Sequence, residues 1–127
     1  MNRIAKFLSS VRFAVAGLWY IVRREQNFQI DLFAALIVIV LMMILPLRSI
    51  EYVILSVAIV SVLVMEIINT VFERMIDILK PRVHPYAKVM KDMMAAAVLL
   101  TALGAGAVGI LIFYPYWPNL VDFFSKL

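Results

Sequence analysis

Three long apolar stretches are the feature that most constrains how this chain can fold. They cover residues 28–47, 52–79 and 93–117, and a helix needs roughly 20 apolar residues to cross the hydrocarbon core of a bilayer. Because 65% of the 127 residues are hydrophobic, a soluble domain of this length would leave too much apolar surface in water. The sequence therefore predicts a single all-α membrane domain with three transmembrane helices, the second of which continues past the bilayer to residue 79.

The segment before the first apolar stretch, residues 3–24, has a different pattern. Its apolar residues recur at helical spacing, as Phe7, Val11, Ala14 and Leu18 show, and five cations accompany them. Such a helix lies in the membrane interface, with its apolar face toward the acyl chains and its cations near anionic headgroups. We expect an amphipathic surface helix over residues 3–24, and packing against a partner domain is the alternative.

The distribution of the twelve Lys and Arg residues predicts the orientation. Five lie within residues 3–24, five lie within 74–91, and the remaining two are Arg48 and Lys126. Cytoplasmic segments carry the excess of basic residues in membrane proteins. We therefore expect the N-terminus and the second loop to face the cytoplasm and the C-terminus to face the opposite side of the membrane.

The third apolar stretch has no charged residue and is rich in small residues. Its small residues are Ala95, Ala96, Ala97, Gly104, Ala105, Gly106 and Gly109, and small residues let transmembrane helices approach closely. Aromatic residues gather where the stretch leaves the membrane, and such residues form an interfacial belt. The predicted belt consists of Tyr114, Tyr116 and Trp117.

Polar side chains interrupt the second apolar stretch at positions that share one face of a helix. They are Glu66, Asn69, Thr70, Glu73 and Asp77, and we call them the polar stripe. A carboxylate inside a span is costly and marks a functional site by default, which singles out Glu66. Plainer explanations exist for the others. Glu73 can pair with Arg74 or Lys80 in water, and Asn69 can bond to a neighbouring helix.

Two further polar clusters lie beside the first and third apolar stretches. They consist of Arg23, Arg24, Glu25 and Asn27, and of Lys88, Lys91 and Asp92. Both are expected on the cytoplasmic side, where carboxylates can hold Mg²⁺ on a nucleotide and cations can neutralise phosphates. A deeper carboxylate can deprotonate a hydroxyl presented from the bilayer. Together the clusters have the parts that phosphoryl transfer requires, although Lys88 taken alone is equally a snorkelling anchor.

The residue types that the chain lacks exclude other chemistry. With no cysteine and a single histidine, His84, the chain has no disulfide, no thiolate nucleophile and no zinc motif. No glycine-rich phosphate-binding loop occurs either. His84 is expected to structure its loop rather than to act as a base, and no nucleic-acid partner is expected.

The ordered motifs resemble those of the small prokaryotic diacylglycerol kinase and undecaprenol kinase family. Residues 66–77 resemble its E-x-x-N-[ST]-x-x-E-x-x-x-D signature, and residues 84–92 resemble its H-x-x-[AS]-x-x-x-K-D motif. Residues 17–28 resemble its N-terminal helix and the turn before the first span. The resemblance covers residues 7–115, in order and at the right spacing.

This resemblance implies a homotrimer with active sites between neighbouring subunits, and MgATP-dependent phosphorylation of a lipid hydroxyl. By position, Glu66 corresponds to the catalytic base, and Glu25 and Glu73 correspond to the ligands of the nucleotide's metal. Phe13 corresponds to an aromatic residue that faces adenine. The other active-site positions, among which Lys91 contacts phosphate, are matched by Asn69, Asp77, Lys91 and Asp92.

The motifs specify the lipid less closely. Residues 25–28 and 84–88 are closer to the undecaprenol kinase branch, so undecaprenol is the first expectation and diacylglycerol the second. Asp31 departs from that branch, in which histidine is frequent at this position. The rival function is a small oligomeric transporter or channel subunit with Glu66 as its proton or cation site. A structural assembly factor is the third alternative.

Overall fold

The computed structural model describes residues 2–79 and 85–126, so His84 and its predicted role lie outside the described residues. Within these ranges the secondary structure is entirely helical, as predicted. The elements are α1 (Arg3–Arg24), α2 (Gln26–Ile44), α3 (Ser49–Leu79), α4 (Pro85–Phe113), the 3₁₀ turn η1 (Tyr114–Tyr116) and α5 (Trp117–Ser125).

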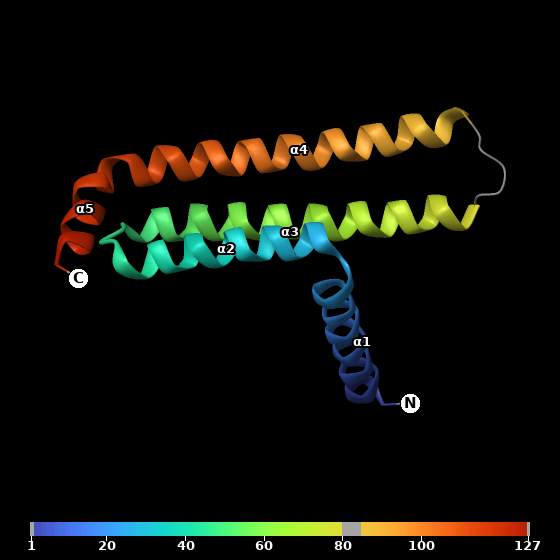
Figure 1. The fold of residues 1–127 in the computed structure, drawn as a ribbon. Coiled ribbons are helices and arrows are strands. Elements are labelled where there is room, and N and C mark those ends of the chain that lie inside the picture. Colours follow the sequence, from blue (N-terminus) through green and yellow to red (C-terminus); the bar gives the residue numbers. More distant parts are fainter. Residues whose placement is uncertain (1, 80–84, 127) are drawn as a thin grey trace.

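The three most apolar of the long helices form a bundle. Figure 1 shows α2, α3 and α4 lying lengthwise beside one another, with α1 leaving at a steep angle from the start of α2. Both α2 and α4 pack against α3, and α4 makes the more extensive contact. The short α5 turns toward the end of the bundle where α2 and α3 are joined. The central helix is therefore α3, which carries the polar stripe.

A proline and a carboxylate set the ends of α2 and α3. The predicted first span reaches residue 47, but α2 ends at Ile44 because the residue before Pro46 is extended, with φ −98° and ψ 143°. The predicted second span begins at residue 52, whereas α3 begins at Ser49. Glu51 Oε2 accepts a hydrogen bond from the Arg48 amide at 2.7 Å. This contact satisfies an amide at the helix start, as the glutamate of a capping box does.

The chain changes direction after α4. This helix begins at Pro85, a residue well suited to a first helical turn, and it ends at Phe113. Pro115 and Pro118 lie in η1 and at the start of α5, where each lacks the amide that would continue an α-helix. The segment 93–117 was expected to be one span; the structure extends that helix back to Pro85, interrupts it at η1 and adds α5.

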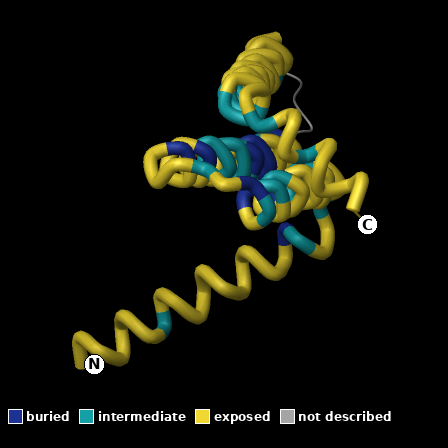
Figure 2. The backbone as a smooth tube through the Cα atoms, turned by 90° about the vertical axis from the view of Figure 1, so that its left-hand side faces the viewer, coloured by how far each residue is buried: buried dark blue, intermediate teal, exposed yellow. Residues whose placement is uncertain are grey.

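Burial is concentrated on α2 and α3, as Figure 2 shows. Phe28 and Leu55 are the largest fully buried side chains, and α4 has no buried residue along its described length. Large exposed apolar side chains occur on all five α-helices, a surface suited to lipid or further protein. By length and composition, α1, α2, α3 and the segment Pro85–Ser125 are each able to cross a membrane. The surface placement of α1 therefore stays a prediction.

The glycines of α4 make no close interhelical contact within the part of the chain that the structure describes. A Cβ atom added at Gly104, Gly106 or Gly109 would meet no other atom within 4 Å among the described residues. Interhelical close approach at these positions is thus not made within a single chain. The small-residue face of α4 is left open.

Candidate active site

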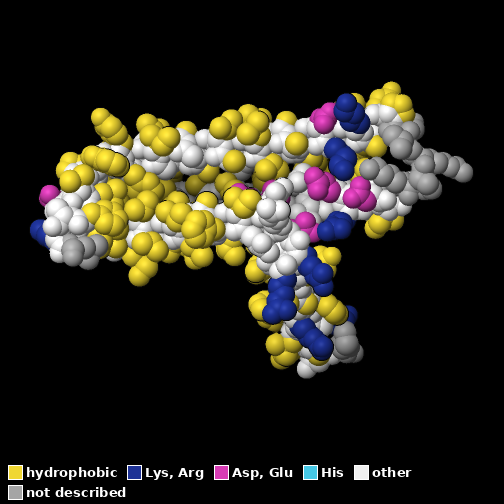
Figure 3. All heavy atoms as spheres, in the orientation of Figure 1, with side chains coloured by type: hydrophobic (Ala, Val, Ile, Leu, Met, Phe, Trp, Pro, Cys, Tyr) yellow, Lys and Arg dark blue, Asp and Glu magenta, His cyan; other side chains and the backbone are white. Residues whose placement is uncertain are grey.

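Charged side chains gather where α3 ends and α4 begins, and the elbow between α1 and α2 meets the same region (Figures 1 and 3). Along the remainder of α2, α3 and α4, the surface seen in Figure 3 is largely apolar. The three polar clusters expected from the sequence therefore lie at one end of the bundle. This arrangement brings together residues from α1, α2, α3 and α4.

Glu66 is the most deeply buried carboxyl of this region, with 4% of the residue exposed. The Asn27 side chain at the start of α2 is placed to hydrogen-bond this carboxyl. The carboxyls of Asp31, Glu73 and Glu25 lie close enough to act on it electrostatically. Four acidic groups from α2, α3 and the elbow thus share one region, which favours the binding of cations.

Asn69 connects the buried and exposed parts of the polar stripe. Asn69 and Thr70 are buried, whereas Glu73, one turn further along α3, is exposed. Asn69 Nδ2 donates a hydrogen bond to Glu73 Oε1 at 3.4 Å. The amide therefore orients the Glu73 carboxylate along the same face of α3 that carries Glu66.

Glu25 occupies the elbow between α1 and α2, where it caps the end of one helix and the start of the other. Gln29 Nε2 donates to the Val22 carbonyl oxygen at 2.9 Å and so braces the elbow. Arg74 Nη2 of α3 lies 2.6 Å from Glu25 Oε1. Arg74 thus pairs across the elbow rather than with Glu73, the neighbour considered from the sequence.

Lys91 connects α4 with the polar stripe. Its Nζ lies 3.7 Å from Asp77 Oδ1 of α3, and both side chains remain partly exposed. Asp92 follows on α4 and is exposed. The contact between Lys91 and Asp77 leaves a cation at the open edge of the acidic region, where it can reach an anionic ligand.

Two expected site features are not assembled within one chain. Phe13 is 72% exposed and lies midway along α1, the helix that leaves the bundle (Figure 1). Within residues 2–79 and 85–126, no three His, Asp or Glu side chains are arranged to hold a metal ion. The donor set of Glu25 and Glu73 still fits Mg²⁺, because this ion is usually bound through one or two carboxylates together with phosphates and water.

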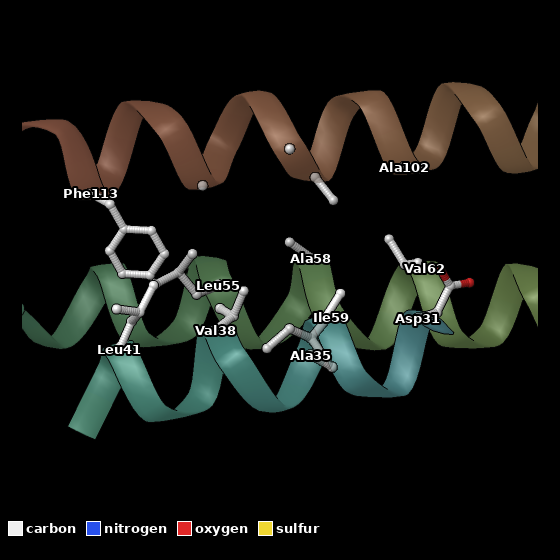
Figure 4. A pocket seen from close by; sticks show the side chains of 14 residues that line it. Asp31, Ala35, Val38, Leu41, Leu55, Ala58, Ile59, Val62, Ala102 and Phe113 are labelled. Atoms are coloured by element: carbon white, nitrogen blue, oxygen red, sulfur yellow. The ribbon is translucent and has the colours of Figure 1, made fainter. Parts of the chain in front are cut away.

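An apolar cavity of about 360 Å³ lies between α2, α3 and α4. Figure 4 shows the side chains that line it, with Phe113 toward one end and Asp31 toward the other. Asp31 is the one charged residue among the fourteen that line the cavity. Because Asp31 also acts electrostatically on Glu66, the cavity adjoins the acidic region at that end.

Comparison with known protein families shows what this chain is similar to. The family model described as prokaryotic diacylglycerol kinase matches residues 12–113. The chain belongs to this family. The match begins within α1 and ends at the last residue of α4, so η1 and α5 of the kinase lie beyond it. The predicted family is confirmed, and membership makes the chain a lipid kinase rather than a transporter subunit or an assembly factor.

Two curated relatives agree with this assignment. The undecaprenol kinase of Bacillus subtilis (strain 168) is 34% identical over 114 residues, which cover 90% of this chain and 93% of the relative. The diacylglycerol kinase of Synechocystis sp. (strain ATCC 27184 / PCC 6803 / Kazusa) is 36% identical over 103 residues, which cover 80% of this chain and 59% of the relative. Both relatives are named as kinases of lipids.

The kinase has two site contacts that sequence reasoning did not predict. Asn27 was grouped with a polar cluster beside the first apolar stretch but was given no partner, and its side chain is placed to hydrogen-bond Glu66. Arg74 was considered only as one possible partner of Glu73, yet it pairs with Glu25. The sequence contained one signal that could have found these contacts, namely the depth of the residues in the membrane. All four residues fall near the cytoplasmic boundary predicted by the basic segments.

Proposed function

We propose that this lipid kinase transfers the γ-phosphoryl group of MgATP to the hydroxyl of undecaprenol, and that diacylglycerol is its second candidate substrate. The observation that carries the proposal is the burial of the Glu66 carboxyl on α3, the helix that runs from the apolar part of the bundle to its charged end (Figure 3). A lipid hydroxyl approaching from the bilayer and a nucleotide approaching from water would meet at this depth.

In the proposed reaction, Glu66 accepts the proton of the lipid hydroxyl while the hydroxyl oxygen attacks the γ-phosphorus. A new bond forms between that oxygen and phosphorus, the bond from the γ-phosphorus to the bridging oxygen breaks, and ADP leaves. Bound Mg²⁺ would neutralise charge on the nucleotide's phosphates. Asn69 supports this step by holding Glu73 on the same face of α3 as Glu66.

The remaining residues are proposed to bind MgATP. Glu25 and Glu73 would hold the metal through their carboxylates, and Lys91 would contact phosphate. Asp77 orients Lys91 from 3.7 Å. Asp92 lies next to Lys91 at the same edge, and Phe13 would face the adenine.

The apolar cavity and the names of the relatives support the choice of lipid substrate. A cavity lined almost wholly by apolar side chains suits a hydrocarbon chain. The relative named undecaprenol kinase aligns with 90% of this chain, which supports undecaprenol as the first substrate. The relative named diacylglycerol kinase supports diacylglycerol as the second.

We further propose a homotrimer in the bacterial inner membrane, with α2, α3 and α4 as the spans, α1 on the cytoplasmic surface and the N-terminus in the cytoplasm. Sites shared between subunits are supported by Phe13, which is 72% exposed and belongs to α1, the helix that leaves the bundle (Figure 1). Gly104 of α4, which does not line the apolar cavity, also has open space beside it that a neighbouring helix can fill.

A transfer assay with radiolabelled ATP tests the proposed function. The purified kinase in nanodiscs receives γ-labelled ATP with undecaprenol, with diacylglycerol or with no added lipid, in the presence and absence of Mg²⁺. We expect Mg²⁺-dependent label in the lipid fraction, with the higher kcat/KM for undecaprenol. A higher value for diacylglycerol would reverse the substrate order, and label in neither lipid would reject both.

A further inference from the structure

Glu51 forms a dense polar cluster at the end of the bundle opposite the candidate active site. Its carboxylate accepts hydrogen bonds from the Arg48 amide at 2.7 Å, from Arg48 Nε at 3.2 Å and Nη2 at 2.9 Å, and from Tyr116 Oη at 2.7 Å. The residue is 6% exposed. The hydrogen bond with Glu51 raises the pKa of Arg48 above its ordinary value, which keeps the guanidinium protonated.

The four hydrogen bonds differ in what they connect. Those from Arg48 are local and stabilise the first turn of α3. The bond from Tyr116 joins residues 65 positions apart and ties η1, which follows α4 directly, to the start of α3. Charge-assisted hydrogen bonds of this length are among the stronger polar contacts in proteins. Tyr116 therefore fastens the far end of α4 to α3.

The contact of α4 with α3 is extensive but shallow. The described length of α4 has no buried residue, and a Cβ atom added at its glycines would meet no atom of another helix within 4 Å. Polar contacts tie α4 to α3 at both ends, through Tyr116 and Glu51 at one and through Lys91 and Asp77 at the other. Between them α4 is a continuous helix without internal proline, so a shift along its axis at one end moves the other end equally.

We propose that Tyr116 and Glu51 are positioning residues for Lys91. Their hydrogen bond sets the axial register of α4 on α3 and thereby holds Lys91 beside Asp77, where Lys91 can bind phosphate. This inference rests on the proposed role of Lys91 in binding MgATP. The pair lies at the opposite end of the bundle from the candidate site, and Tyr116 lies outside the residues that the family model matches.

The first test compares Tyr116→Phe with a matched control, Tyr52→Phe. Tyr52 Oη donates to the Met42 carbonyl oxygen at 2.9 Å, so the control loses a tyrosyl hydrogen bond at the same end of the bundle without involving α4. We expect Tyr116→Phe to raise the KM for MgATP about fivefold to tenfold and to leave the KM for lipid unchanged. Tyr52→Phe should leave both constants within about twofold. Equal effects of the two variants on the KM for MgATP would overturn the proposal.

A second measurement tests the axial register of α4 on α3 independently of the role of Lys91 in binding phosphate. Because the chain has no cysteine, spin labels can be attached at introduced cysteines replacing the exposed residues Ile78 of α3 and Met93 of α4. Labelled protein is diluted with unlabelled protein, and the distance distribution is compared with and without Tyr116→Phe. A shifted or broadened distribution supports the register. An unchanged one overturns it.

The two readouts together distinguish failure of this inference from failure of the proposed function. A changed distance with an unchanged KM for MgATP would show that the register is set as proposed but that Lys91 does not bind phosphate. If Tyr116 acts through Lys91, adding Tyr116→Phe to Lys91→Met should weaken MgATP binding no further than Lys91→Met does. Additive losses of binding in the double variant would contradict that route.

Discussion

Arg74 Nη2 lies 2.6 Å from Glu25 Oε1, across 49 positions of sequence. The pair closes the elbow between α1 and α2 against α3. Glu25 is also a proposed ligand of Mg²⁺, so the metal and the guanidinium would compete for the charge of one carboxylate.

That competition predicts a change in magnesium dependence. Arg74→Gln should lower the Mg²⁺ concentration that gives half-maximal activity by roughly twofold to fivefold. The change should be modest because exposed ion pairs are weak, so that loss of the pair makes Glu25 only slightly more available to the metal. The measurement is an Mg²⁺ titration at fixed free ATP. Arg24→Gln, which alters an exposed arginine of the same region, is the control and should leave the midpoint in place. A higher Mg²⁺ requirement in Arg74→Gln would count against Glu25 as a ligand.

Lys91 and Lys88 offer a matched pair of cations on α4. Lys91 lies beside Asp77 at 3.7 Å, whereas Lys88 is exposed one turn earlier and fits an interfacial anchor. We expect Lys91→Met to raise the KM for MgATP at least about tenfold, since a charge-assisted phosphate contact is lost. Lys88→Met should change it by less than about twofold. Similar KM values for the two variants would remove the phosphate role from Lys91.

Leu55 provides a test of packing energetics in lipid. Leu55 on α3 is 2% exposed, whereas Val57 on the same helix is 60% exposed. Lipid is as apolar as a leucine side chain, so Leu55→Ala loses packing contacts but little transfer free energy. We expect the free energy of unfolding to fall by about 1–3 kcal/mol, which is less than the same substitution costs in many cores of soluble proteins.

Unfolding with increasing mole fraction of sodium dodecyl sulfate in mixed micelles measures this loss. Val57→Ala should remain within about 0.5 kcal/mol of the unsubstituted protein. Equal losses for the two variants would show that Leu55 is not packed in the bundle as the structure has it.

Periodicity and hydropathy predicted the helical class of this protein, because apolar length alone demands helices in lipid. The same signals were weaker at helix ends. Residues 114–125 illustrate the difficulty: two prolines divide an apolar run into η1 and α5, and a window of mean hydropathy averages across such breaks. The Glu51 and Tyr116 contact was also invisible, since nothing local relates residues 65 positions apart.

The residues of the candidate site also divide into those that the sequence could group and those that it could not. Glu66, Asn69 and Glu73 could be grouped from sequence, because one helix places them on one face by its period. The partners of Glu25 and Lys91 needed the packing of separate helices on α3, and sequence spacing carries no information on that packing. The role of Phe13 remains a prediction, because this residue is exposed on α1, the helix that leaves the bundle (Figure 1).

The central claim is that Glu66 takes the proton of the lipid hydroxyl, and Glu66→Gln tests it most directly. The substitution keeps the shape of the side chain and removes its basicity. Rates of phosphoryl transfer and the affinity for MgATP are measured on the same nanodisc preparation. The account predicts a fall in kcat of about 10²-fold to 10⁴-fold with MgATP affinity retained. A variant that turns over at close to the unsubstituted rate would contradict it.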